Sequence, residues 1–128
     1  PVDRRQRQMC IRDRKRNEGS IFFTGATASM RGGSGFSAFS SAKFALRAVS
    51  QSMARELGPE GIHVAHFVID GAIDTAFIKE TFPETYALKE KDGILQPDAI
   101  ADTYWYVHSQ HRSAWTHELD LRPYMEKF

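Results

Sequence analysis

Cysteine is almost absent from this sequence of 128 residues, which contains Cys10 alone. A single cysteine forms no intramolecular disulfide and has no second thiol with which to share a structural zinc ion. This composition is typical of proteins from a reducing compartment, so we expect a cytoplasmic protein.

Long hydrophobic runs are missing as well. The sequence has no apolar stretch of about eighteen residues, and no basic leader followed by an apolar segment and a small-residue cleavage site. The pattern therefore predicts neither a membrane span nor a secretory signal. A hydrophobic content of 41% is nevertheless sufficient for the core of one small domain.

Positive and negative charges nearly balance, at a net +1, but the first residues depart from this balance. Residues 1–16 carry seven basic and two acidic side chains, without helical or strand periodicity. We interpret them as a non-native or disordered basic segment, similar to translated sequencing adapter joined to a truncated gene. A nucleic-acid-binding arm is the alternative, but no aromatic residue is interleaved for base stacking, so no nucleic-acid partner is expected.

The rest of the chain predicts alternating strands and helices. Apolar runs at residues 19–24 and 62–69 are typical of buried strands, and alternation over residues 116–122 predicts a third strand. Residues 37–57 predict a long helix between the first two strands. This order gives a strand-helix-strand crossover, so we expect an α/β protein with three adjacent parallel strands.

Two helices are expected to cover this sheet. In the long helix, apolar side chains recur every three or four residues and predict the core-facing stripe, whereas small residues predict a second face that a partner subunit could approach closely. The stripe consists of Phe39, Ala42, Leu46, Val49, Met53 and Leu57, and the small face includes Ala38, Ala45, Ala48 and Ser52. After a mixed region at residues 71–93, Pro97 begins a second helix whose apolar face is Ile100, Ala101, Tyr104, Trp105 and Val107.

Binding sites of open parallel sheets lie beyond the carboxyl ends of the strands, here in the loops after Thr24 and Ile69. Residues 21–64 read IFFTGATASMRGGSGFSAFSSAKFALRAVSQSMARELGPEGIHV, which resembles the strand, serine loop, Tyr-x-x-x-Lys helix and following strand of the short-chain dehydrogenase/reductase family. Gly71-Ala-Ile-Asp-Thr75 is similar to that family's Pro-Gly-x-x-x-Thr segment. The resemblance implies that residues 17–128 are the C-terminal half of a Rossmann-like domain, with a truncated, doubly wound parallel sheet.

The sequence departs from the family pattern at positions that matter for chemistry. Phe39 stands in the position of the catalytic Tyr, Ala26 in that of the catalytic Ser, and Asp70 where Pro is usual, whereas Lys43 is retained. The glycine-rich turn Thr-Gly-x-x-x-Gly-x-Gly, which holds the dinucleotide pyrophosphate in the family, does not occur in these 128 residues. Nearby hydroxyl groups that could replace the missing ones belong to Ser29, Ser37 and Ser40.

The resemblance implies a nicotinamide cofactor, NAD or NADP, and a small carbonyl or alcohol substrate. The implied catalytic positions are Lys43, Phe39 and Ala26, and the implied cofactor-binding residues are Lys43, Gly71, Ile73 and Thr75. In this arrangement Lys43 bonds the nicotinamide ribose, and Ile73 and Thr75 contact the carboxamide. The resemblance also implies a homo-oligomer. A solvated helix lysine and a loop threonine without a ligand are the alternatives for Lys43 and Thr75.

Histidines invite a metal-site interpretation, which we do not favour. His63 and His66 lie three apart on a predicted strand and so point to opposite faces of the sheet. His108 and His111 have no evident third ligand, so we predict no metal site. The sequence therefore predicts an NAD(P)-dependent oxidoreductase, present as a fragment and inactive alone. A noncatalytic scaffold or cofactor-sensing relative is the alternative.

Overall fold

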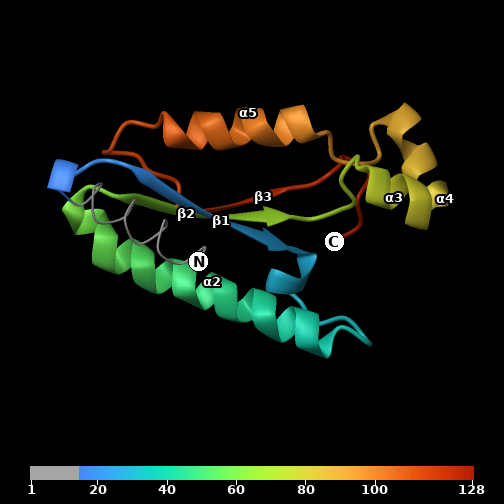
Figure 1. Ribbon diagram of the computed structural model, residues 1–128, viewed down its shortest axis with the longest axis horizontal. Helices are drawn as coiled ribbons and strands as arrows, with labels where there is room; N and C mark the ends of the chain where they lie inside the picture. The colour runs from blue at the N-terminus through green and yellow to red at the C-terminus, as the bar shows by residue number, and fades with distance from the viewer. Residues whose placement is uncertain (1–14) are drawn as a thin grey trace.

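The computed structural model describes residues 15–128 (Figure 1). The regular elements are β1 (Ser20–Ala26), α2 (Ser37–Leu57), β2 (His63–Ile69), α3 (Ala76–Thr81), α4 (Pro83–Tyr86), α5 (Pro97–His108) and β3 (Glu118–Leu121). Three short 3-10 turns, η1 (Thr27–Ser29), η2 (Gly58–Glu60) and η3 (Ala87–Lys91), join them. The predicted basic segment 1–16 lies almost wholly outside the described residues.

The three strands form one parallel sheet in the order β1-β2-β3, as the sequence predicts. Strand β1 continues two residues beyond the predicted end, to Ala26, because Gly25 and Ala26 keep pairing with Val68 and Ile69. Strand β3 is shorter than predicted and spans Glu118–Leu121. Strand β2 is buried along its whole length, as expected for the central strand of a covered sheet.

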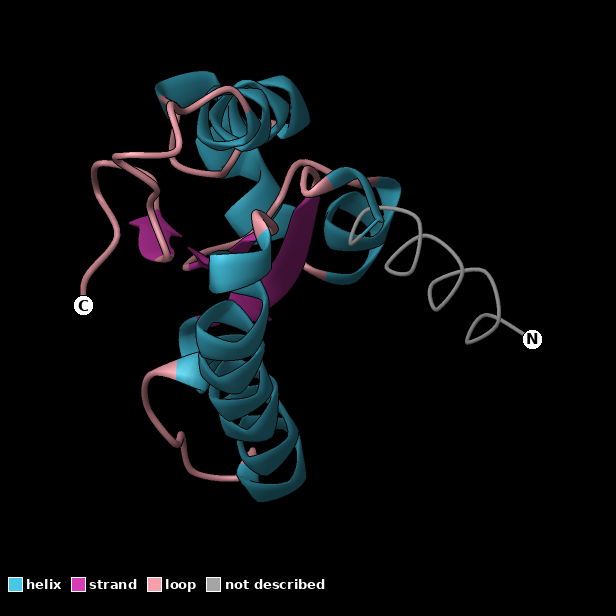
Figure 2. Ribbon diagram, turned by 90° about the vertical axis from the view of Figure 1, so that its left-hand side faces the viewer, coloured by secondary structure: helices cyan, strands magenta, loops and turns pink. Residues whose placement is uncertain are grey.

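One helix covers each face of the sheet, with α2 on one side and α5 on the other (Figures 1 and 2). The core on the α5 side is built around Ala65, Phe67, Ile69 and Val107. The core on the α2 side is smaller and contains Leu57, Ile62 and Val64, against which Ile21, Phe23, Met53 and Ala54 pack. No helix among residues 15–128 is both long enough and apolar enough to cross a bilayer.

The predicted core-facing stripe of α2 is partly wrong. Phe39 and Val49 are 48% and 47% exposed, whereas the buried residues of α2 are Ser40, Ser50 and Leu57. Small side chains on the buried face let the helix backbone lie close to the sheet. The Ser50 hydroxyl also donates within the helix, to the carbonyl oxygen of Arg47 at 2.7 Å, so its burial leaves no donor unsatisfied.

The second helix, α5, packs through fewer residues than its sequence suggests. Val107 is fully buried, and the Tyr104 ring stacks on the Phe67 ring at a centroid distance of 3.7 Å. Burial raises the pKa of the Tyr104 hydroxyl, which hydrogen-bonds to the Thr24 hydroxyl at 2.7 Å. Trp105 is 69% exposed, so it is not part of the packed face that was predicted.

Candidate functional site

The carboxyl ends of β1 and β2 lie side by side, with Ala26 opposite Ile69 in the strand register. The loops that follow these strands therefore begin next to each other. One loop starts with η1 after Ala26, and the other contains Gly71, Ile73 and Thr75. This edge of the sheet is where the sequence locates the site.

Lys43 is held beside the end of β1. Its ammonium nitrogen donates to the backbone carbonyl oxygen of Thr24 at 3.1 Å. The same nitrogen lies 5.8 Å from the centre of the Phe39 ring, one helical turn earlier. An ammonium group has three N–H donors, so Lys43 keeps donors for a ligand after binding Thr24.

Ala26 lies at the last position of β1, and its backbone N–H donates to the Ser29 hydroxyl oxygen at 3.0 Å. Ser29 is fully buried and Ser40 is only 6% exposed. Neither hydroxyl reaches solvent, so neither replaces the hydroxyl that Ala26 lacks. Of the three nearby serines, Ser37 alone is exposed.

Backbone contacts and a helix cap hold the second segment of the predicted site, which contains Gly71, Ile73 and Thr75. Gly71 has a φ of 146°, and a Cβ there would lie 2.9 Å from the Cδ of Pro123. Ile73 pairs with Leu95 through an isolated parallel bridge. Thr75 caps α3, because its hydroxyl oxygen accepts from the backbone N–H of Ile78 at 3.3 Å. The Thr75 hydroxyl proton stays available to a ligand.

Asp70, which the sequence flags only as a departure from Pro, links the two loops. Asp70 is buried, and its carboxylate accepts a hydrogen bond from the Thr27 hydroxyl. Arg122 donates to the other carboxylate oxygen at 3.3 Å, and an Arg31 nitrogen lies 3.9 Å from the oxygen that Thr27 binds. The Asp70 backbone N–H also donates to Leu121 at 2.8 Å, a bond that a proline would lack.

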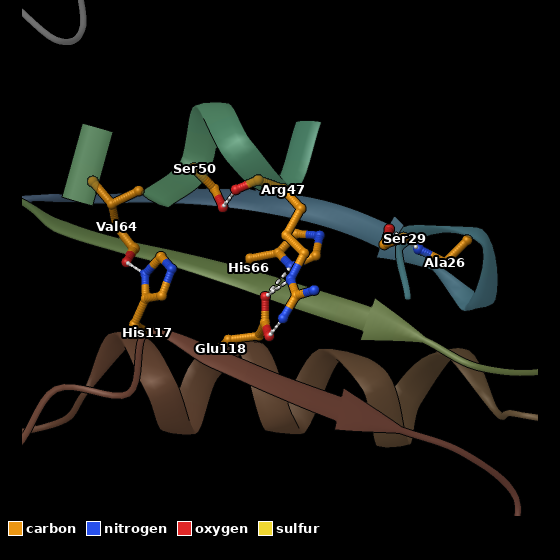
Figure 3. Close-up of polar contacts among 8 residues, drawn as sticks. All are labelled: Ala26, Ser29, Arg47, Ser50, Val64, His66, His117 and Glu118. Carbon is orange, nitrogen blue, oxygen red and sulfur yellow. Dashed lines mark hydrogen bonds and ion pairs between the residues drawn. The ribbon is translucent and has the colours of Figure 1, made fainter. Parts of the chain in front are cut away.

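Behind the site, a charged network joins α2 to the sheet (Figure 3). The Arg47 guanidinium donates to both carboxylate oxygens of Glu118, at 2.8 and 2.7 Å. The His66 Nδ1 lies 3.0 Å from one of the same oxygens. The hydrogen bonds from Arg47 hold the pKa of the Glu118 carboxyl below its ordinary value, and the hydrogen bond from His66 lowers it further. The sequence predicts only that His66 is not a metal ligand, and it does not predict the contact with Glu118.

This lowered pKa predicts a pH dependence of stability. The Glu118 contribution should be complete above the unfolded-state pKa of about 4.3 and should be lost as the pH falls through the lower folded-state pKa. Urea unfolding between pH 6 and 3 should therefore show a steeper loss in the wild type than in Glu118→Gln. Asp74→Asn is the control for the Asp74–Lys89 ion pair, in which the pKa of the aspartate is also lowered. Equal slopes for the wild type and Glu118→Gln would contradict the expectation.

The histidines of β2 point to opposite faces of the sheet, as predicted. His63 stacks on Trp115 at a centroid distance of 4.7 Å, and its burial lowers the pKa of the imidazole. His66 instead faces α2 and Glu118. Helix α5 ends at His108, so His111 is not on it. Within residues 15–128, no three acidic, histidine or cysteine side chains are grouped as metal ligands.

Comparison with known proteins establishes the family. Residues 6–85 match the short chain dehydrogenase family, and the chain belongs to it. A short-chain dehydrogenase from Rhodopseudomonas palustris is 50% identical, with a TM-score of 0.64 over 87% of this chain and 41% of that protein. The 3-dehydrosphinganine reductase of Danio rerio is 32% identical over 91 residues, which are 69% of this chain and 27% of the relative.

More distant structures share the fold. The closed form of a serine dehydrogenase complexed with NADP+ is 17% identical, with a TM-score of 0.72 over 91% of this chain and 48% of that protein. The chain therefore spans less than half the length of each of these three proteins. The comparisons confirm the predicted family and the Rossmann-like α/β class.

Proposed function

We propose that this chain is part of a longer NAD(P)-dependent oxidoreductase that acts on a small carbonyl or alcohol substrate. The observation that carries the proposal is the position of Lys43, whose ammonium group is held on the Thr24 carbonyl at the carboxyl end of β1. Membership of the short chain dehydrogenase family supports the same reaction class. In this proposal the protein is cytoplasmic and homo-oligomeric.

The donors at the site fit a nicotinamide nucleoside. Lys43 would donate to the ribose hydroxyls, and Ile73 and Thr75 would contact the carboxamide. Gly71 supports this fit, because its positive φ and its contact with Pro123 leave the backbone of the turn without a side chain. The cofactor supplies the hydride when it is bound. Lys43 would orient the ribose, and Gly71 would keep the turn free of a side chain.

The position of Phe39 favours a second candidate, a noncatalytic scaffold or cofactor-sensing protein. A phenyl ring has no proton to donate to a carbonyl oxygen, and Ala26 has no hydroxyl to hold that oxygen. In this second proposal the Lys43 and Gly71 regions bind the cofactor without turnover.

The two candidates differ in turnover. The full-length protein should be titrated with NADH and NADPH and then assayed on a panel of aldehydes and ketones. Cofactor binding with turnover supports the oxidoreductase, whereas binding without turnover supports the sensor. Absence of binding would exclude the sensor and the oxidoreductase together and leave the scaffold.

The 128-residue chain alone should bind NADH and NADPH weakly, with dissociation constants above about 1 mM. The reason is that the glycine-rich turn for the pyrophosphate is not in this sequence, and that turn normally binds the phosphates at a helix N-terminus. Isothermal titration of the chain with each cofactor measures this. Micromolar binding would show that this chain holds the dinucleotide without that turn.

A further inference from the structure

A continuous set of contacts runs from the helix that carries Lys43 to the turn that carries Ala26. It begins on α2, where Lys43 and Arg47 are one turn apart and so project from the same face. The Arg47 guanidinium binds both oxygens of Glu118, at 2.8 and 2.7 Å. A two-pronged bond of this kind fixes the direction of the side chain as well as its distance.

Glu118, on β3, connects Arg47 of α2 to His66 of β2. It lies opposite His66 in the strand register, and its Oε2 is shared by Arg47 and the His66 Nδ1. A carboxylate only accepts hydrogen bonds, so the Nδ1 must carry the imidazole proton. In the neutral ring the lone pair is then on Nε2, which is buried and has no hydrogen-bond partner among the described residues.

The imidazole in turn supports the end of β1. Gly25 lies directly against it, because a Cβ at Gly25 would lie 2.6 Å from the Ser29 hydroxyl oxygen and closer still to the His66 Nε2. The Ser29 hydroxyl then accepts from the Ala26 backbone N–H at 3.0 Å. His66 and Ser29 therefore both lie against Gly25, next to the last residue of β1.

We propose that Arg47, Glu118 and His66 are positioning residues, which hold Lys43 and the Ala26 turn in a fixed relation at the candidate site. The functional meaning of this inference rests on the proposed function. Its geometric content does not, because the bond from Lys43 to the Thr24 carbonyl is measurable without cofactor. Loss of the two hydrogen bonds from Arg47 to Glu118 would free α2 to rotate and would weaken the bond from Lys43 to Thr24.

The test measures how fast the Lys43 amine is acylated. The full chain is treated with a trace of an acetyl ester, and acetylation of each lysine is read by peptide mass spectrometry. In Arg47→Met and in Glu118→Gln, Lys43 should react about fivefold faster, the factor that corresponds to loss of one net hydrogen bond, while Lys79 and Lys91 are unchanged. Arg47→Lys keeps the positive charge but cannot bond both oxygens of Glu118 in the same way, so it should give a smaller increase in the acetylation rate of Lys43.

Leu57→Ala is the control for general loosening, because Leu57 is buried at the far end of α2 and touches neither Lys43 nor the network. An equal increase at Lys43 in Leu57→Ala would overturn the proposal, as would an unchanged rate in Arg47→Met and Glu118→Gln. In a separate experiment on the full-length protein, NADH or NADPH should slow the acetylation of Lys43. Failure of protection alone would count against the proposed function and leave the positioning role intact.

Discussion

Replacing Phe39 with Tyr and Ala26 with Ser together should raise the carbonyl reductase rate of the full-length protein by about 10²- to 10⁴-fold. The ring of the new tyrosine would lie beside Lys43, because the ammonium nitrogen is 5.8 Å from the centre of the Phe39 ring. A nearby ammonium favours the phenolate and so makes the phenol a better proton donor. The measurement is the kcat for an aldehyde and ketone panel, with cofactor affinity measured alongside.

Phe44→Tyr is the matched control, because Phe44 lies one residue beyond Lys43 and is 42% exposed. It adds the same hydroxyl to the same helix in a different direction. Cofactor affinity should change little in both variants. An unchanged rate in the double variant, with a wild type that already turns over the substrates rapidly, would show that Phe39 does not occupy the proton-donor position.

Gly25→Ala should lower the free energy of unfolding by about 3 kcal/mol, at the upper end of the usual cost of overpacking. The added methyl group would meet the buried His66 ring and the Ser29 hydroxyl at once. Neither neighbour moves freely, because His66 is bonded to Glu118 and Ser29 to Ala26. Urea unfolding monitored by circular dichroism measures the change.

Gly32→Ala is the control for a glycine substitution without a clash, because a Cβ there has nothing within 4 Å. It should leave the stability within about 0.5 kcal/mol of the wild type. Adding His66→Ala should relieve part of the Gly25→Ala cost, so the two substitutions should be strongly non-additive. Simple additivity would mean that the His66 ring is not what limits the space at Gly25.

The sequence was sufficient for the strand and helix order, because the apolar runs of β1 and β2 and the long period of α2 are local signals. The orientation of α2 was not predictable in the same way. Phe39 and Val49 recur at helical spacing, yet the buried face uses Ser40 and Ser50, since close approach of the backbone depends on small side chains rather than on hydrophobicity.

The polar contacts of the site were still less predictable. Asp70 and Arg122 are 52 residues apart, as are His66 and Glu118. Such pairs follow from the register between β2 and β3, which depends on how two strands far apart in the sequence pair rather than on a local spacing. The roles of Lys43, Phe39, Ala26, Gly71, Ile73 and Thr75 stay predictions, although the structure shows the contacts of each.

Truncation of residues 122–128 should be poorly tolerated, because their side chains contact the segment that begins at Asp70. Pro123 lies against Gly71, Arg122 holds Asp70, and the Arg122 guanidinium lies 3.6 Å from the centre of the Phe128 ring. Cutting the chain after Leu121 would remove Arg122 from a buried carboxylate and uncover the turn that carries Ile73 and Thr75. A protease that trims these last residues would therefore loosen the two loops, which the hydrogen bond from the Thr27 hydroxyl to Asp70 would still join.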